Sequence, residues 1–127
     1  MAYPTGSGSE ILYRGTIHNQ SNTATAFRWD KTNPTTGTST YTVPALHIIT
    51  ILTISITEVD GNNENFDMLL NDGTNNIYLL QDVELAGDAT FIYSDRLCLV
   101  GGDKLTIYTA SAANVDIHYT FIDQDWS

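Results

Sequence analysis

The sequence contains little cysteine, and this shortage excludes two kinds of small protein. Cys98 is the single cysteine, so the chain can build neither an internal disulfide framework nor a cysteine-rich zinc site. Cys98 lies within the apolar segment 97–100. Because unpaired cysteine behaves as a small hydrophobic residue, we expect its side chain to be buried and not to act as a nucleophile.

Long apolar runs are also missing. The longest run, residues 45–56, is interrupted by His47 and by three hydroxyl-bearing residues, and it falls short of the ~20 apolar residues that a membrane-spanning helix requires. Residues 1–9 lack the basic region and apolar stretch of a secretory signal. We therefore expect a protein that is made and folded in a cytoplasm and has no membrane partner.

Basic residues are scarce relative to acidic ones. The chain has 5 Lys and Arg against 15 Asp and Glu, which gives a formal net charge of −10. Such a charge repels phosphate groups, so nucleic acid is not expected as a partner. Two interpretations of the charge remain open. It can simply keep the protein soluble, or it can keep the protein unassociated until it meets a specific, complementary surface.

Helix-forming patterns are nearly absent, whereas strand patterns are frequent. Short segments rich in β-branched and aromatic residues alternate with Gly-, Asn- and Asp-containing turns, which is typical of an antiparallel sandwich or barrel. We predict an all-β, jelly-roll-like antiparallel β-sandwich, with residues 1–9 as a flexible N-terminal arm and residues 10–127 as a single domain. The predicted strands are 11–17, 23–29, 47–59, 66–70, 77–85, 90–93, 97–100, 105–110 and 115–122.

Side-chain alternation predicts which residues form the core. Ile54 and Ile56 alternate with hydroxyl residues, and this parity breaks near Ile51 and Leu52, which predicts a β-bulge. In the last predicted strand the residues at 115, 117, 119 and 121 share one face. The predicted core contains Ile54, Ile56, Leu79, Val83, Leu99, Leu105, Ile107, Ile117 and Tyr119.

No catalytic or metal-binding pattern stands out. His18, His47 and His118 lack the short spacing of metal ligands, and only a trimer axis could bring three copies of His118 or of His47 together. No Gly-x-Ser-x-Gly elbow is present. The oxygen-rich segments 60–65 and 71–73 could offer calcium ligands, although hairpin turns explain both. We expect no enzyme activity, no cofactor and no metal.

Aromatic residues suggest two kinds of surface. On an exposed face they could form a sugar-stacking platform, and in a core or interface they would supply apolar area. The candidates are Trp29, Trp126, Tyr13, Tyr41, Tyr78, Tyr93, Tyr108 and Tyr119. Trp126 is next to the last residue, so we expect it to pack on its own domain or to anchor an interface. We place Tyr3, Pro4 and Phe121 with it at a partner interface, since Pro4 favours an extended backbone.

Four short segments carry a resemblance to a known group of proteins. They are Thr-Val-Pro at 42–44, Tyr-Leu-Leu at 78–80, Gly-Asp-Lys-Leu at 102–105 and Ala-Ser-Ala at 110–112. In this order they resemble segments of small virion proteins of tailed bacteriophages, except that Lys104 interrupts the third segment. The resemblance extends over residues 41–122, about two thirds of the chain.

This resemblance implies a virion structural protein and supplies no catalytic residues. As a capsid decoration (cement) protein, the chain would bind the outside of an assembled shell. Its partners would be the major capsid protein and its own copies, with a trimer as the first expectation, and its location would be the capsid surface. The alternative is a receptor- or glycan-binding domain of a phage tail fibre or baseplate.

Overall fold

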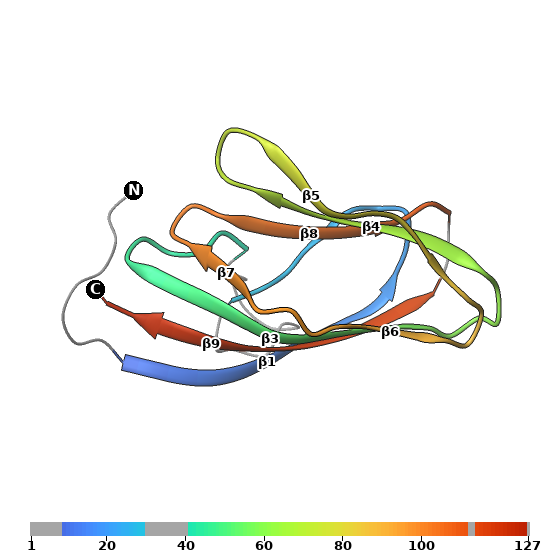
Figure 1. Ribbon diagram of the computed structural model, residues 1–127, viewed down its shortest axis with the longest axis horizontal. Helices are drawn as coiled ribbons and strands as arrows, with labels where there is room; N and C mark the ends of the chain where they lie inside the picture. The colour runs from blue at the N-terminus through green and yellow to red at the C-terminus, as the bar shows by residue number, and fades with distance from the viewer. Residues whose placement is uncertain (1–8, 30–40, 112–113, 127) are drawn as a thin grey trace.

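Nine strands form two antiparallel sheets that pack face to face in the computed structural model (Figure 1). The structure describes residues 9–29, 41–111 and 114–126. Within these ranges no helix has the length and apolar content needed to cross a membrane. The strands are β1 (Ser9–Gln20), β2 (Thr25–Ala26), β3 (His47–Glu58), β4 (Glu64–Asn71), β5 (Asn76–Leu85), β6 (Thr90–Tyr93), β7 (Leu97–Val100), β8 (Lys104–Thr109) and β9 (Val115–Asp125).

The two sheets differ in how their edges are built. The five-stranded sheet has the order β1-β9-β3-β6, and β7 also pairs with β3. Because β7 pairs with residues 48–51 of β3 and β6 with residues 54–57, the two short strands form one interrupted edge. The four-stranded sheet has the order β2-β8-β4-β5. The edge strands are therefore β1 and β6–β7 in one sheet, and β2 and β5 in the other.

Strand β3 confirms the bulge predicted from its sequence. Its register with β9 shifts between Ile51 and Thr53. The extra residue, Leu52, changes the parity of the strand. As a result Ile51 before the bulge and Ile54 after it both face the core, and both are fully buried.

The core lies between the sheets and contains most of the residues predicted for it. Seven of the nine are at most 2% exposed: Ile54, Ile56, Leu99, Leu105, Ile107, Ile117 and Tyr119. Leu79 and Val83 are only partly buried against this core, because they lie on the edge strand β5. The antiparallel β-sandwich predicted from the sequence is thus confirmed.

Aromatic rings fill the part of the core next to β2. The ring of Tyr119 lies 4.8 Å from Phe27 and 6.0 Å from Trp29, measured between centroids. Its hydroxyl donates to the carbonyl of Arg28 at 2.9 Å and accepts the Arg28 N–H at 3.0 Å. Gly15 of β1 covers this ring so closely that a Cβ there would lie 2.1 Å from Tyr119 Cζ. Only glycine fits at this position of β1, because any side chain would collide with the ring of Tyr119.

The N-terminal third of the chain differs most from the sequence prediction. Ser9 already begins β1, so it does not belong to an arm, and the rest of the predicted arm lies outside the described residues. The predicted strand 23–29 is reduced to β2, because only Thr25 and Ala26 pair with β8. Phe27 and Trp29 instead carry aromatic side chains into the core.

Cys98 corrects the expectation of a buried thiol. It lies on β7, where Leu99 points into the core, and its own side chain is therefore exposed. Partial removal from water and the negative charge of Asp103 raise the pKa of the thiol above its ordinary value. A raised pKa leaves little thiolate at neutral pH, so the expectation that Cys98 is not a nucleophile agrees with its surroundings.

Candidate functional site

A groove lies on the outer face of the five-stranded sheet, where β9 runs between β1 and β3. Its volume is about 370 Å³, and it is lined by Thr16, Ile17, His18, Ser55, Thr57, Asp116, Ile117 and His118. Strand alternation explains why six of these eight residues are polar, because the core takes most apolar side chains of these strands on the other face. The register places His118 between Thr16 of β1 and Ser55 of β3.

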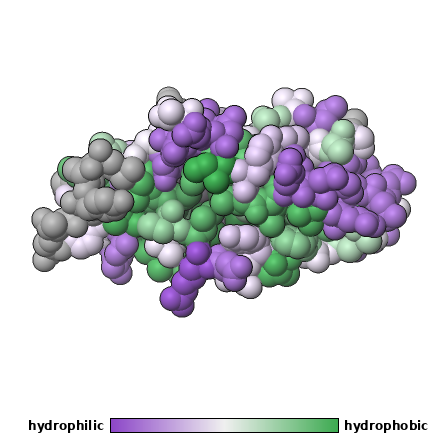
Figure 2. Space-filling view, turned by 45° about the horizontal axis from the view of Figure 1, so that its top comes forward, coloured by the Kyte–Doolittle hydropathy of each residue, from purple (hydrophilic) through white to green (hydrophobic). Residues whose placement is uncertain are grey.

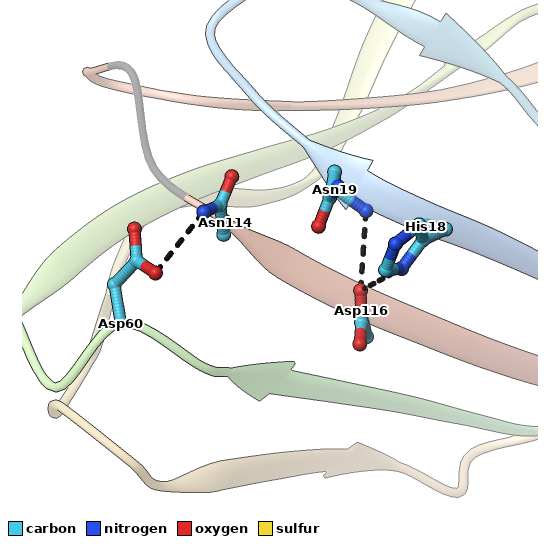
Figure 3. A network of polar contacts seen from close by, with 5 residues as sticks. All are labelled: His18, Asn19, Asp60, Asn114 and Asp116. Atoms are coloured by element: carbon cyan, nitrogen blue, oxygen red, sulfur yellow. Dashed lines mark hydrogen bonds and ion pairs between the residues drawn. The ribbon is translucent and has the colours of Figure 1, made fainter.

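One carboxylate organises the polar end of this groove (Figure 3). Asp116 Oδ1 lies 2.9 Å from His18 Nδ1 and accepts the backbone N–H of Asn19 at 3.1 Å. Asn19 has a left-handed φ of 54° and lies at the irregularity in the β1–β9 pairing. Beside it, Asn114 Nδ2 donates to Asp60 Oδ1 at 3.0 Å and ties the start of β9 to the β3–β4 turn.

The groove lacks the arrangement of a catalytic centre. Among the described residues no hydrogen bond joins the hydroxyl of Ser55 to His18 or His118. In the same part of the chain, no group of three His, Cys, Asp or Glu side chains could hold a metal ion. Six of the eight lining residues have polar side chains, which can form hydrogen bonds with a neighbouring molecule.

His47 belongs to a separate cluster at the other end of β3. Its Nδ1 lies 2.8 Å from Asp123 Oδ1, and its Nε2 lies 3.2 Å from Asp125 Oδ1. Both nitrogens can donate only when the ring is protonated. The cluster joins the start of β3 to the end of β9. The three histidines therefore do not form one site within a single copy.

Trp126 and Leu46 form an apolar corner next to this cluster. The backbone N–H of Trp126 donates to the carbonyl of Leu46 at 3.0 Å. Leu46 is exposed and has a φ of 63°, a conformation that costs about 1–2 kcal/mol for a residue with a Cβ. The indole Nε1 of Trp126 is buried without an acceptor among the described residues. The exposed side chain of Leu46 offers apolar area for contact with another protein.

Exposed apolar side chains gather on the edges of the sandwich. Eight large hydrophobic residues are exposed in the described part of the chain, and five of them lie on edge strands: Ile11 and Leu12 on β1, Ile77 and Tyr78 on β5, and Ile92 on β6. Figure 2 shows a band of hydrophobic side chains that runs along the molecule between hydrophilic margins. Edges are the places where neighbouring chains can add to a sheet.

Two tyrosines lie together on the outer face of the four-stranded sheet. The hydroxyl of Tyr108 donates to Asp67 Oδ2 at 2.8 Å and lies 3.3 Å from the hydroxyl of Tyr78. These contacts, first with Tyr78 and then with Asp67, raise the pKa of Tyr108, so its phenol stays protonated. Trp29 and Tyr119 are buried in the core. These two residues are therefore excluded from the aromatic platform considered from the sequence, whereas Tyr78 and Tyr108 lie on an outer face where they could contribute to one.

The two oxygen-rich segments form hairpin turns, as their sequences suggest. Asp72 Oδ1 accepts the N–H groups of Thr74 and Asn75 at 2.9 and 2.7 Å. These bonds, with Asn75 first, lower the pKa of the Asp72 carboxyl. Gly73 and Gly61 have φ values of 95° and 79°, which favour glycine. Hairpin geometry accounts for both segments.

Glu58 anchors the first of these turns from within the protein. Its carboxylate accepts the N–H groups of Asp60, Gly61 and Asp88 at 2.9, 2.8 and 2.9 Å. The bond from Asp88 has the largest effect and lowers the pKa of the carboxyl, while removal from water acts in the opposite direction. Glu58 therefore links the β3–β4 turn to the β5–β6 turn.

Replacing Glu58 with glutamine should remove a pH-dependent part of the stability. The folded pKa lies below its ordinary value of 4.5, so the carboxylate stabilises the fold above that pH, and this contribution is lost as the pH falls through the folded pKa. We expect Glu58→Gln to lower the Tm at pH 7 and to flatten its decrease between pH 5 and pH 3, followed by circular dichroism. Glu84→Gln, at an exposed position of β5, is the control. An unchanged pH slope in Glu58→Gln would contradict the anchoring role.

The structure separates the four residues that the sequence places at a partner interface. Phe121 is 1% exposed, and its ring centroid lies 5.3 Å from that of Trp29. The alternation that buries Tyr119 also buries Phe121, so Phe121 supports the core and does not face a partner. Trp126 is half-buried at the corner with Leu46. Tyr3 and Pro4 lie outside the described residues.

No family model matches the chain, and no curated protein matches it. Among solved structures, it is similar to a Bacillus endospore appendage protein, with a TM-score of 0.55, 12% identity, and 96% of this chain and 93% of the other covered. A protein of infectious bursal disease virus strain Gx gives a TM-score of 0.49 and 11% identity, with 97% and 35% covered. A xylan-binding domain from Paenibacillus barcinonensis gives 0.45 and 10%, with 97% and 98% covered. At such identities, the match to the appendage protein shows a shared β-sandwich fold.

Proposed function

We propose that this chain is a non-enzymatic structural subunit of a virion, a decoration (cement) protein that binds the outside of an assembled shell. The observation that carries the proposal is the placement of exposed apolar side chains along the sheet edges: Ile11, Leu12, Ile77 and Ile92. Exposed apolar edges are a hazard for a protein that works alone, because they recruit other strands. In an assembled subunit, neighbouring chains cover them.

The charge of the chain supports the same role. A net charge of −10 opposes indiscriminate association of free copies through their apolar edges. A shell surface of complementary charge would offset this repulsion and steer docking. The major capsid protein is then the partner. A trimer is the arrangement of copies that we predict from the sequence. The Bacillus appendages, whose subunit has a similar sandwich, form disulfide-linked pili.

A glycan-binding role is the second candidate, and the pair Tyr78 and Tyr108 favours it. Tyrosine rings on an exposed sheet face can stack on sugar rings, and Asp67 beside them could accept a sugar hydroxyl. In this role the chain would be a tip domain of a tail fibre or baseplate. Truncating Tyr78 would then remove glycan binding and leave assembly intact.

The number of copies per particle separates the two roles. In particles purified with this chain, a decoration protein should occur in numbers of the same order as the major shell protein, because it covers a repeating lattice. A tip domain should occur only a few times. Quantitative densitometry of the purified particles measures the ratio of the two proteins. A ratio corresponding to only a few copies would contradict the decoration role.

A further inference from the structure

Strand β1 is the least protected edge of the sandwich. In the four-stranded sheet, β2 has two residues, and β5 pairs irregularly with β4 and contains Asp82 at a φ of 52°. On the opposite edge from β1, residues 94–96 interrupt β6 and β7. In contrast, β1 has 12 residues and pairs with β9 in an unbroken register from Ser9 to Ile17. Sheets usually blunt their edges, because unpaired N–H and C=O groups recruit other strands.

The side chains of β1 offer no protection either. Residues 9–20 contain no proline and no lysine, the residues that most often guard an edge. Leu12 is 63% exposed, the largest value among the exposed large hydrophobic residues that the structure describes. Ile11 beside it is also exposed. Among the described strands only β9 pairs with β1, so its other edge is available to a further strand.

We propose that β1 pairs antiparallel with β1 of a second copy, in a register centred on Leu12. This register places Leu12 opposite Leu12 of the second copy, and Glu10 opposite Arg14 of the second copy, twice by symmetry. All three residues are exposed on the face away from the core. On the core side, Ile11 lies opposite Tyr13. This inference rests on the proposed role as an assembled subunit. It specifies one of the contacts that would join the copies.

Charge complementarity favours this register over those centred on Glu10 or Arg14. Centring the pair on Glu10 or on Arg14 places like charges opposite each other, which destabilises a strand pair. Centring it on Leu12 gives two pairs of opposite charge on either side of an apolar pair. Arg14 has no ion-pair partner in the described part of the chain, and the second copy supplies one. Glu10 already accepts the side-chain amide of Gln124 at 2.7 Å, and its carboxylate can accept further bonds.

The pairing would join two five-stranded sheets into one continuous sheet across the two copies. It is a two-fold contact in which the same strand serves both sides. Because the main-chain groups of β1 supply its hydrogen bonds, their number does not depend on side chains. The charged and apolar side chains determine the register. Substitutions of these side chains can therefore test the register.

Disulfide trapping tests the register directly. In a Cys98→Ser background, Leu12→Cys places two thiols directly opposite each other, at a separation that a disulfide can bridge. Thr16→Cys, on the same face of the same strand, is the matched control. In the proposed register its two thiols lie eight residues apart along the strand, about 26 Å. Mild oxidation should convert most of Leu12→Cys, and little of Thr16→Cys, into covalent dimer. Equal trapping of both variants, or trapping of neither, would overturn the register.

A charge reversal tests the same contact without cross-linking. Arg14→Glu should weaken the dimer about tenfold in sedimentation equilibrium, because two attractive cross-strand pairs become repulsive. Glu10→Arg combined with Arg14→Glu should restore the wild-type dissociation constant. A strictly monomeric chain, or a self-association that Arg14→Glu leaves unchanged, would overturn the pairing. A monomeric chain that still decorates particles would leave the proposed function standing, and a dimer that decorates nothing would leave the pairing standing.

Discussion

Replacing Ile54 with alanine should lower the free energy of unfolding by about 2–5 kcal/mol. Ile54 is fully buried at the centre of β3, between Tyr119 of β9 and Tyr93 of β6. The loss combines the transfer energy of the deleted methyl groups with the cavity that they leave. Ile117→Ala on β9 should give a loss of similar size, because Ile117 is 2% exposed in the same core. Urea unfolding followed by tryptophan fluorescence measures both.

The adjacent residue Ser55 provides the control for this prediction. It follows Ile54 on β3 but lies in the groove on the outer face of the sheet. Ser55→Ala should therefore change the free energy of unfolding by no more than about 0.5 kcal/mol. A large loss for Ser55→Ala with none for Ile54→Ala and Ile117→Ala would show that β3 and β9 present the opposite faces to the core.

Much of the fold could be predicted from the sequence, because side-chain alternation and turn residues act locally. The bounds predicted for β6 and β7 agree with the structure, and the parity break near Leu52 is the observed bulge. Which strand pairs with which depends on residues far apart in the sequence, and the errors in the predicted strands arise there. The segment 23–29 has strand-like composition, but β8 pairs with only two of its residues. Cys98 is exposed because alternation along β7 points Leu99 into the core and Cys98 away from it, and the uniformly apolar sequence of this strand does not reveal which face is buried.

Less of the candidate site could be predicted, because its contacts join distant segments. His18 and Asp116 are 98 positions apart, and only the β1–β9 register brings them together. The corner of Trp126 and Leu46 depends on a left-handed conformation at Leu46, for which leucine gives no signal. The burial of Phe121 was predictable, since it shares the parity of Tyr119 on the last strand.

The most direct test of the decoration role is the occupancy of Trp126→Ala on particles stripped of this chain. Trp126 is half-buried beside the exposed Leu46, so a partner that docks at this corner can cover the rest of its side chain. Truncating such an anchor costs about 2 kcal/mol or more, a loss of roughly 30-fold in affinity. Circular dichroism first establishes that the variant is folded, and Tyr78→Ala serves as the control on the opposite sheet.

Recombinant wild-type chain and both variants are added back to the stripped particles, and bound protein is quantified over a range of concentrations. The decoration role predicts that wild type and Tyr78→Ala saturate the particle. It predicts that Trp126→Ala falls far below them, with a further loss for all three at high salt where charge steers docking. Full occupancy by Trp126→Ala, together with loss of cell or glycan binding in Tyr78→Ala, would contradict the decoration role and favour the glycan-binding tip.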